Sequence, residues 1–188
     1  GHLEAAKEGF SSLGNYKDAP QQLEYVIKEQ ERQTTYQKAQ ALMQEGNYPE
    51  AMALFRDLGD YSDANAQLTH AQAQVTENER KAQFSQAESL ETEGKYEDAM
   101  AIYAALGNYS NAEYHYQNLS QKIKSYEDAK VQENRKNFEN AKSLYESAGQ
   151  YLDAEVKAKE MEYQLLYNEA KQYEDIYDFS RAAGIYQE

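Results

Sequence analysis

This 188-residue chain contains three histidines and three pairs of neighbouring acidic residues, which are the side chains that could bind a metal or act in catalysis. The acidic pairs are Glu97-Asp98, Glu127-Asp128 and Glu174-Asp175, and paired carboxylates can act as general acid and base. The first pair falls in the first turn of an expected helix, where acidic side chains interact favourably with the positive N-terminus. We therefore interpret the pairs as solvated helix faces and predict no catalytic residue.

The histidines give no metal-binding pattern either. His2 belongs to a Gly1-His2 start that resembles a cloning remnant, while His70 and His115 lie at unrelated positions without a His-x3-His spacing. We predict that both are solvated surface residues. The chain has no cysteine, which excludes disulfides, thiolate metal sites and cysteine nucleophiles. It also has no calcium-binding loop and no P-loop, so we expect no metal and no cofactor.

The charge balance bears on the class of partner. The chain has 33 acidic and 19 basic residues, a net charge of -14, and no basic run. Nucleic acids and anionic membranes are recognised through Lys and Arg, so neither is an expected partner. A basic peptide or a cationic protein face is the natural electrostatic complement. No stretch approaches the roughly 18 apolar residues of a membrane span, so we expect no membrane insertion.

The 18 tyrosines recur in a repeated string that determines the architecture. The string of residues 46–64, GNYPEAMALFRDLGDYSDA, returns with small changes at residues 94–112 and 136–154. A unit that cannot bury its own apolar face must stack on copies of itself. The aromatic residues could form a stacking platform for a ligand, but their helical spacing in every copy favours interior packing.

Glycines and first-turn residues divide each copy into helices. Gly46 and Gly59 are expected to end helices, which places a short helix at about residues 48–58 and a long one at about 17–45. Lys136 and Tyr177 replace the first glycine in the third and fourth copies. Either they adopt a left-handed conformation or the two helices join through a smoother bend. After the second turn the apolar residues follow a 4-3-4 spacing, which indicates one helical stripe. We predict an all-α fold.

The order of small and aromatic residues resembles the tetratricopeptide repeat. In one copy the order is Ala39, Leu42, Gly46, Tyr48, Ala51, Phe55 and Leu58, and three further copies follow it. The variant most similar to it is a Gly-x-Tyr-x2-Ala-x3-Phe-x2-Leu-Gly-x-Tyr-x-Asp-Ala repeat common in Gram-positive bacteria. The resemblance implies a right-handed α-solenoid that binds peptides through exposed residues of the first helix of each unit. Mapped by position, these candidate residues are Gln40, Met43, Gln44, Glu88, Glu91, Thr92, Lys130, Glu133, Asn134, Lys171, Glu174 and Asp175.

The period differs from that family. Copies follow at 45, 48, 42 and 41 residues instead of 34. The excesses of 7 to 14 residues are close to whole helical turns, at 3.6 residues each. Insertions of whole turns keep the apolar residues on the same face of a continuous helix. A flexible loop could have any length. We predict that a short helix of about 11 residues alternates with a continuous long helix of about 28 to 34.

We expect one repeat domain over residues 1–188 that is a fragment of a larger protein. Its predicted parts are a tag remnant at 1–2, a partial unit at 3–30, repeats at 31–78, 79–120 and 121–162, and a partial repeat at 163–188. The expected function is a non-catalytic scaffold for another protein or peptide, with self-association as a further option. The alternative is a stiff helical spacer or accessory domain that holds a separate catalytic or anchoring domain.

Overall fold

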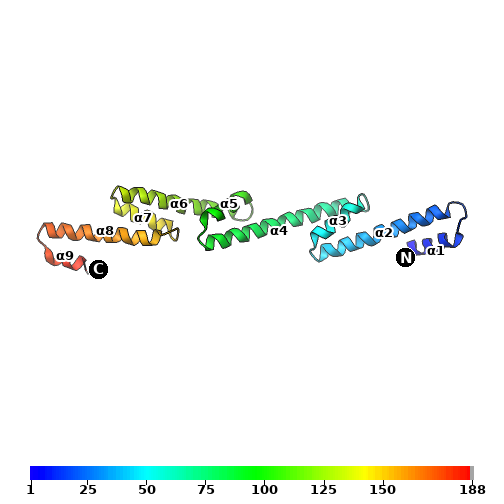
Figure 1. Ribbon diagram of the computed structural model, residues 1–188, viewed down its shortest axis with the longest axis horizontal. Helices are drawn as coiled ribbons and strands as arrows, with labels where there is room; N and C mark the ends of the chain where they lie inside the picture. The colour runs from blue at the N-terminus through cyan, green and yellow to red at the C-terminus, as the bar shows by residue number, and fades with distance from the viewer. Residues whose placement is uncertain (187–188) are drawn as a thin grey trace. The chain divides into compact units, whose positions relative to one another are not determined.

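The computed structural model describes residues 1–186, and in that range every regular element is an α-helix (Figure 1). The helices, in chain order, are α1 (His2–Leu13), α2 (Ala19–Gln44), α3 (Tyr48–Leu58), α4 (Ala64–Thr92), α5 (Tyr96–Leu106), α6 (Ala112–Asn134), α7 (Phe138–Ala148), α8 (Ala154–Asp175) and α9 (Phe179–Ile185). The all-α prediction is confirmed.

Short and long helices alternate as the period predicts. The short helices α3, α5 and α7 have 11 residues each. The long helices α2, α4, α6 and α8 are continuous, but with 26, 29, 23 and 22 residues only α4 reaches the predicted length of 28 to 34. The predicted long helices were too long because the two turns of each repeat contain residues that belong to no helix. There are three such residues before each short helix and five after it.

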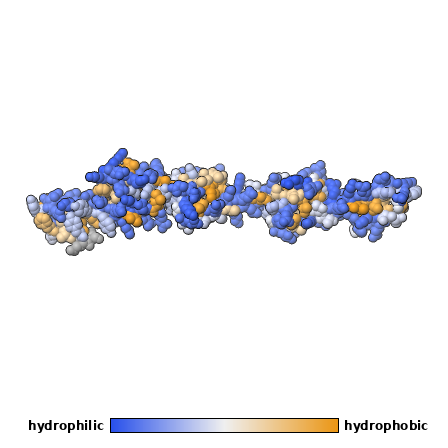
Figure 2. All heavy atoms as spheres, in the orientation of Figure 1, coloured by the Kyte–Doolittle hydropathy of each residue, from blue (hydrophilic) through white to orange (hydrophobic). Residues whose placement is uncertain are grey.

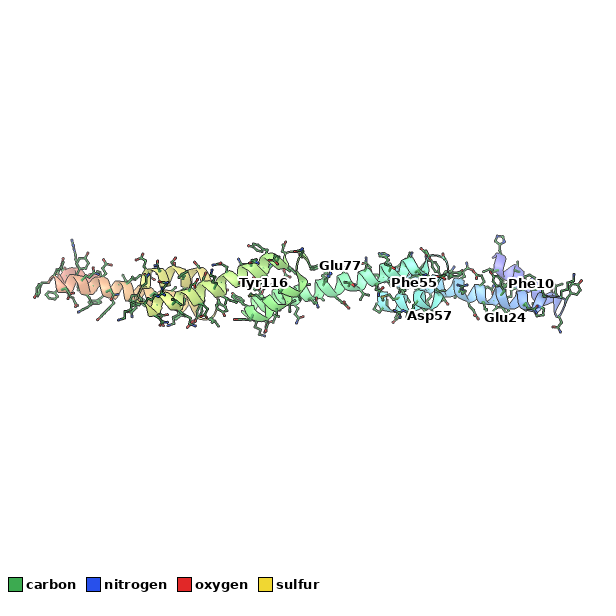
Figure 3. The ribbon with its side chains drawn as sticks, turned by 90° about the horizontal axis from the view of Figure 1, so that it is seen from above. Phe10, Glu24, Phe55, Asp57, Glu77 and Tyr116 are labelled. Carbon is green, nitrogen blue, oxygen red and sulfur yellow. The ribbon has the colours of Figure 1, made fainter. Side chains whose placement is uncertain are left out.

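Each short helix packs at a joint, a term we use for the end of one long helix, the short helix after it and the start of the next long helix. In the first joint Ala39 of α2, Ala51 and Phe55 of α3, and Ala64 of α4 are all fully buried. Phe55 is buried while its neighbour Asp57 on α3 is exposed (Figure 3). Alanines at the crossings let the helices approach closely, and the aromatic ring fills the remaining space.

The second and third joints share one continuous core in α4 to α8. Its fully buried side chains include Tyr103, Leu119 and Tyr145, and half-buried Tyr116, labelled in Figure 3, packs against it. The two joints can merge because α6, which connects them, has only 23 residues. Figure 2 shows that most of the viewed surface is hydrophilic, with apolar residues confined to small areas.

The chain divides into two compact units within α4, Gly1–Glu79 and Arg80–Glu188. Side chains of residues 76–83, which include Glu77 (Figure 3), are all exposed. With 29 residues, α4 is longer than the packed stripes at its two ends require. The first unit also contains α1, which packs on α2 but has no buried residue of its own.

The turn before each short helix is a Schellman motif. After α2 the N–H of Asn47 donates to the carbonyl of Leu42 at 2.9 Å, and the N–H of Gly46 donates to Met43 at 3.2 Å. The motif places one residue at positive φ. Gly46 has φ 77°, and Lys136 and Tyr177 both have φ 60° in the later copies. Of the two alternatives for these non-glycine residues, the left-handed conformation is therefore correct.

The turn after each short helix requires glycine more strictly. Gly59 has φ 58° and ψ -120°, and Tyr61 N–H donates to Leu58 at 3.2 Å. These are the dihedrals of the first central residue of a type II′ turn, which residues with a Cβ avoid. A left-handed helical conformation, by contrast, costs a non-glycine residue about 1–2 kcal/mol. This difference explains why residues other than glycine occur at the glycine position only in the turn before a short helix and not in the turn after it.

We expect Gly59→Ala to lower the free energy of unfolding by about 2–3 kcal/mol and Gly46→Ala by only about 1 kcal/mol. Both penalties are conformational, because a Cβ at either position would meet no atom within 4 Å. Urea denaturation of the two variants checks the order. Lys136→Gly is the converse control and should stabilise the chain. Equal losses at Gly59 and Gly46 would contradict the assignment of the turns.

Candidate functional site

The predicted binding residues lie at the ends of the long helices, in sets of three. Within each set the outer two side chains are exposed and the middle one is half-buried. The middle residues are Met43, Glu91, Glu133 and Glu174. In three of the four sets, two or three of these residues line a hollow beside the short helix.

We call these hollows the first, second and third groove. The first groove, of about 450 Å³, is lined by Gln40, Met43, Gln44, Tyr48, Gln67, His70 and Gln74. The second, of about 570 Å³, is lined by Glu88, Glu91, Thr92, Glu93, Gly94, Tyr96, His115, Lys122 and Gln150. The third, of about 620 Å³, is lined by Glu133, Asn134, Lys136, Phe138, Glu160, Met161, Tyr163 and Gln164. Each contains the end of one long helix, the residues at the start of the short helix, and side chains of the next long helix.

Of the four remaining predicted residues, Lys130, Lys171 and Glu174 make local contacts. Lys130, one turn before the third groove's Glu133 and Asn134, pairs with Glu127 at 3.2 Å, and its ammonium lies 5.6 Å from the centroid of the Tyr126 ring. In the fourth set, Lys171 pairs with Glu174 at 2.5 Å. Asp175 is exposed at the end of α8.

The middle glutamates accept hydrogen bonds from the tyrosines of the short helices. The hydroxyl of Tyr103 donates to Glu91 Oε2 at 3.0 Å, and that of Tyr145 donates to Glu133 Oε2 at 2.5 Å. Tyr103 and Tyr145 are fully buried, and a buried hydroxyl without an acceptor is costly. Tyr186 donates to Glu174 at 3.2 Å in the same way. Glu91 and Glu133 therefore hold their joints together and also line a groove.

The first joint uses an apolar pair at the same two positions. Phe55 stands in the place of Tyr103 and Tyr145, and Met43 stands in the place of their glutamates. Phenylalanine has no hydroxyl, so its joint needs no acceptor. Met43 thus places an apolar side chain where the other two grooves have a glutamate, in a groove with no charged residue in its lining.

A second recurring contact joins consecutive long helices. The hydroxyl of Tyr36 donates to Asp63, and that of Tyr126 donates to Asp153 at 2.6 Å. Asp153 makes no side-chain cap at the helix that follows it. The acidic residues before these helices thus serve mainly as acceptors for a distant tyrosine, a role that the cap pattern did not predict.

The prediction for His115 was wrong. Its ring stacks on Tyr103 at 4.9 Å between centroids, and its Nδ1 lies 2.8 Å from Glu91 Oε2. Its side chain is 26% exposed, so it is a packed, half-buried residue and not a solvated one. His70, in contrast, is exposed, and its ring nitrogen lies 3.3 Å from the amide of Gln74.

The acidic pairs also have structural partners. Glu97 accepts from the hydroxyl of Tyr151 at 2.6 Å, a contact between α5 and the turn after α7. Interpreting these pairs as solvated faces thus missed the tertiary contacts of Glu97 and Glu174. In residues 1–186 no group of three or more His, Cys, Asp or Glu side chains could hold a metal ion.

The candidate residues predicted from the sequence form only one wall of each groove, and the residues of the opposite wall were not predicted. The opposite wall consists of residues from the next long helix, such as Gln67, His70 and Gln74 in the first groove. A signal was present, because these residues directly precede the apolar stripe residues Leu68, Ala71 and Val75. Positions next to a buried stripe lie at its edge, where the neighbouring helix leaves room for a hollow.

The tyrosine–carboxylate contacts predict a loss of stability at alkaline pH. The hydrogen bond to Asp153 and burial raise the pKa of Tyr126 to about 12, and the bond to Glu97 and burial raise the pKa of Tyr151 to about 12. The unfolded chain ionises its tyrosines near pH 10, so unfolding releases protons between about pH 10 and 12. The free energy of unfolding is therefore expected to fall as pH rises through this window.

Urea denaturation at several pH values from about 9 to 11.5 checks this expectation. The double variant Tyr126→Phe/Tyr151→Phe should show a shallower fall than the natural sequence, because two titrating groups are gone. Tyr163→Phe removes an exposed hydroxyl from the same unit and should leave the slope unchanged. An unchanged slope in the double variant would show that these two hydroxyls do not control the alkaline loss.

None of the helices described in residues 1–186 has the length and apolar character that crossing a membrane requires. Searches of curated proteins and of solved structures give no match. The family model of the tetratricopeptide repeat matches residues 10–58 and 54–113, which together cover more than half of the chain. Each match contains a short helix and the long helix before it, α2 with α3 and α4 with α5, in the order that the family resemblance predicts. The chain belongs to the tetratricopeptide repeat family.

Proposed function

We propose that this chain is a non-catalytic scaffold that binds another protein through its grooves, and that it is a fragment of a larger protein. The observation that carries this proposal is the recurrence of a groove at equivalent positions of three joints with a different lining each time. Packing alone requires the buried alanines and aromatics to recur, as they do. The exposed lining varies freely, as a surface does when each copy contacts a different part of a partner.

Repeats of this family generally mediate protein–protein interactions and are typically non-catalytic. A protein or peptide that lies in a groove would make shallow contacts with helices that are already ordered. A pre-formed surface lowers the ordering cost of association, so modest contacts suffice for measurable affinity. The net charge of -14 makes nucleic acid an unsuitable partner.

A random library of 12-residue displayed peptides, selected on the immobilised protein, tests this proposal. The expected result is a set of enriched peptides whose affinity falls at least about fivefold in the triple variant Gln44→Ala/Thr92→Ala/Asn134→Ala. These are exposed members of the three predicted sets that line a groove. The matched control Gln72→Ala/Asn140→Ala removes two exposed amides outside the grooves and should change nothing.

The alternative is that the chain serves as a stiff spacer or accessory domain. A spacer needs no selective surface, so selection would give no enriched peptides, or peptides that bind the triple variant as tightly as the natural sequence. Either outcome would overturn the scaffold proposal.

A further inference from the structure

A further hollow lies in the third joint and shares no residue with the three grooves. It has a volume of about 470 Å³ and lies between α7 and the start of α8. We call it the α7–α8 hollow. Its lining consists of Lys142, Glu146, Gly149, Glu155, Val156, Ala158, Lys159 and Glu162. None of these residues was predicted from the sequence as a binding residue, and none lines a groove.

The α7–α8 hollow exists because α8 has a small side chain where the other long helices have a large one. Ala158 is buried and lines the hollow. The equivalent residues are Leu23 in α2, Leu68 in α4 and Tyr116 in α6. Leu68 and Tyr116 are half-buried and pack against the cores of their own joints. Protein interiors are close-packed, so a side chain that stops at Cβ leaves open the space that a leucine or tyrosine fills elsewhere.

Two aliphatic side chains at the N-terminal end of α8 are exposed instead of packed. Val156 lines the hollow and is 59% exposed. Leu152, in the turn before α8, is 68% exposed, and its equivalents in the other copies are the polar residues Lys17, Ser62 and Ser110. A single exposed aliphatic residue is ordinary, whereas exposed apolar residues gathered at a hollow mark a site of protein interaction.

The charges at the α7–α8 hollow do not favour a charged ligand. The ammonium of Lys142 lies 3.0 Å from the carboxylate of Glu162 and 3.9 Å from that of Glu146, so these side chains pair with one another. Lys159 and Glu155 add one charge of each sign. Selection by charge requires a lining of one sign. Size and apolar character therefore decide what binds in this hollow.

From the space over Ala158 and the exposed aliphatic residues beside it, we infer that the α7–α8 hollow binds one large apolar side chain, a leucine, phenylalanine or tyrosine, of a partner protein. This side chain takes the place that Leu68 and Tyr116 fill from within the chain, and it packs on Val156. Those two residues show that a joint accommodates a side chain of this size, presented by a protein segment. The inference rests on the scaffold function proposed above and gives it a second surface, whose chemistry is apolar.

Ala158→Leu tests the inference because it fills the hollow from within. The probe is a peptide, enriched from the 12-residue library, that NMR maps to the amides of Gly149 and Val156. Replacing one leucine, phenylalanine or tyrosine of this peptide with alanine should weaken its binding at least about tenfold, and Ala158→Leu should weaken the unchanged peptide by a similar factor. Ala158→Leu should leave the urea midpoint unchanged or raise it, because leucine occupies the equivalent position of the first joint. The lost affinity then results from the filled hollow and not from unfolding.

Ala101→Leu, at an exposed position of α5 outside the hollow, is the matched control and should not change the affinity. Val156→Gln introduces the residue that α2 has at the equivalent position, Gln21, and should weaken the peptide about threefold. If Ala158→Leu lowers the urea midpoint, Val156→Gln decides the test.

The inference is overturned if no enriched peptide maps to the α7–α8 hollow, or if a mapped peptide binds Ala158→Leu and Val156→Gln as tightly as the natural sequence. In those cases the scaffold proposal still stands, provided that peptides bound in the grooves lose affinity in the triple variant. If selection enriches no peptide at all, the scaffold proposal fails and this inference fails with it.

Discussion

Phe55→Ala is expected to lower the free energy of unfolding of the first unit, residues 1–79, by about 3–5 kcal/mol. Phe55 is fully buried and fills the first joint between Tyr36, Tyr61 and three helices. Its ring lies 5.9 Å from that of Tyr36, and the edge-to-face contact would be lost with it. A small joint has few neighbours that can move into the cavity, so little of this cost is recovered.

Hydrogen exchange measured by mass spectrometry suits this prediction because it reports each region separately. Amides of α3 and the end of α2 should lose protection in Phe55→Ala, while those of α7, in the separate second core, should keep it. Tyr25→Ala is the matched control, since this aromatic residue of the same unit is 65% exposed. It should change stability by no more than about 0.5 kcal/mol. An equal loss of protection in α7 would show that the two cores unfold as one.

Glu133→Met is expected to destabilise the third joint by about 1–3 kcal/mol. The substitution leaves the hydroxyl of fully buried Tyr145 without its acceptor and removes one of the two partners of Lys157. Methionine itself fits the position, because Met43 occupies the equivalent place in the first joint. The loss should therefore come from the unsatisfied hydroxyl and not from the packing.

The double variant Glu133→Met/Tyr145→Phe recreates the pair that the first joint uses. It should recover most of the lost stability in urea denaturation, because neither member then needs a hydrogen-bond partner. Glu139→Met, at an exposed position of α7, controls for the lost charge. If the double variant is as unstable as the sum of its single variants, the two positions are not coupled and the contact does not stabilise the joint.

Much of the fold could be predicted from local patterns. Glycine positions and the spacing of alanines and aromatics determine where helices begin and end, because these depend on a residue and its near neighbours in the chain. The 11-residue short helices and the continuous α4 were predicted in this way. The predicted lengths of α2, α6 and α8 were wrong, since subtracting the short helix from the period ignores the residues of the two turns.

The sequence also contains a signal for the tyrosine contacts. Phe55 occurs with Met43 where Tyr103 and Tyr145 occur with glutamates, and Phe84 occurs with Asn111 where Tyr36 and Tyr126 occur with aspartates. Each loss of a hydroxyl is matched by the loss of its carboxylate. Comparing the copies with one another would have identified the pairs without a structure.

By itself the sequence determined an all-α tetratricopeptide-type repeat, its 11-residue short helices and one wall of each groove, because periodic patterns report which face of a helix is buried. Tertiary structure alone decided the rest. It placed the second wall of each groove and made His115 part of a packed joint. Such contacts depend on how two helices cross, and residues such as Glu91 and His115 are brought together by helices that are far apart in the chain.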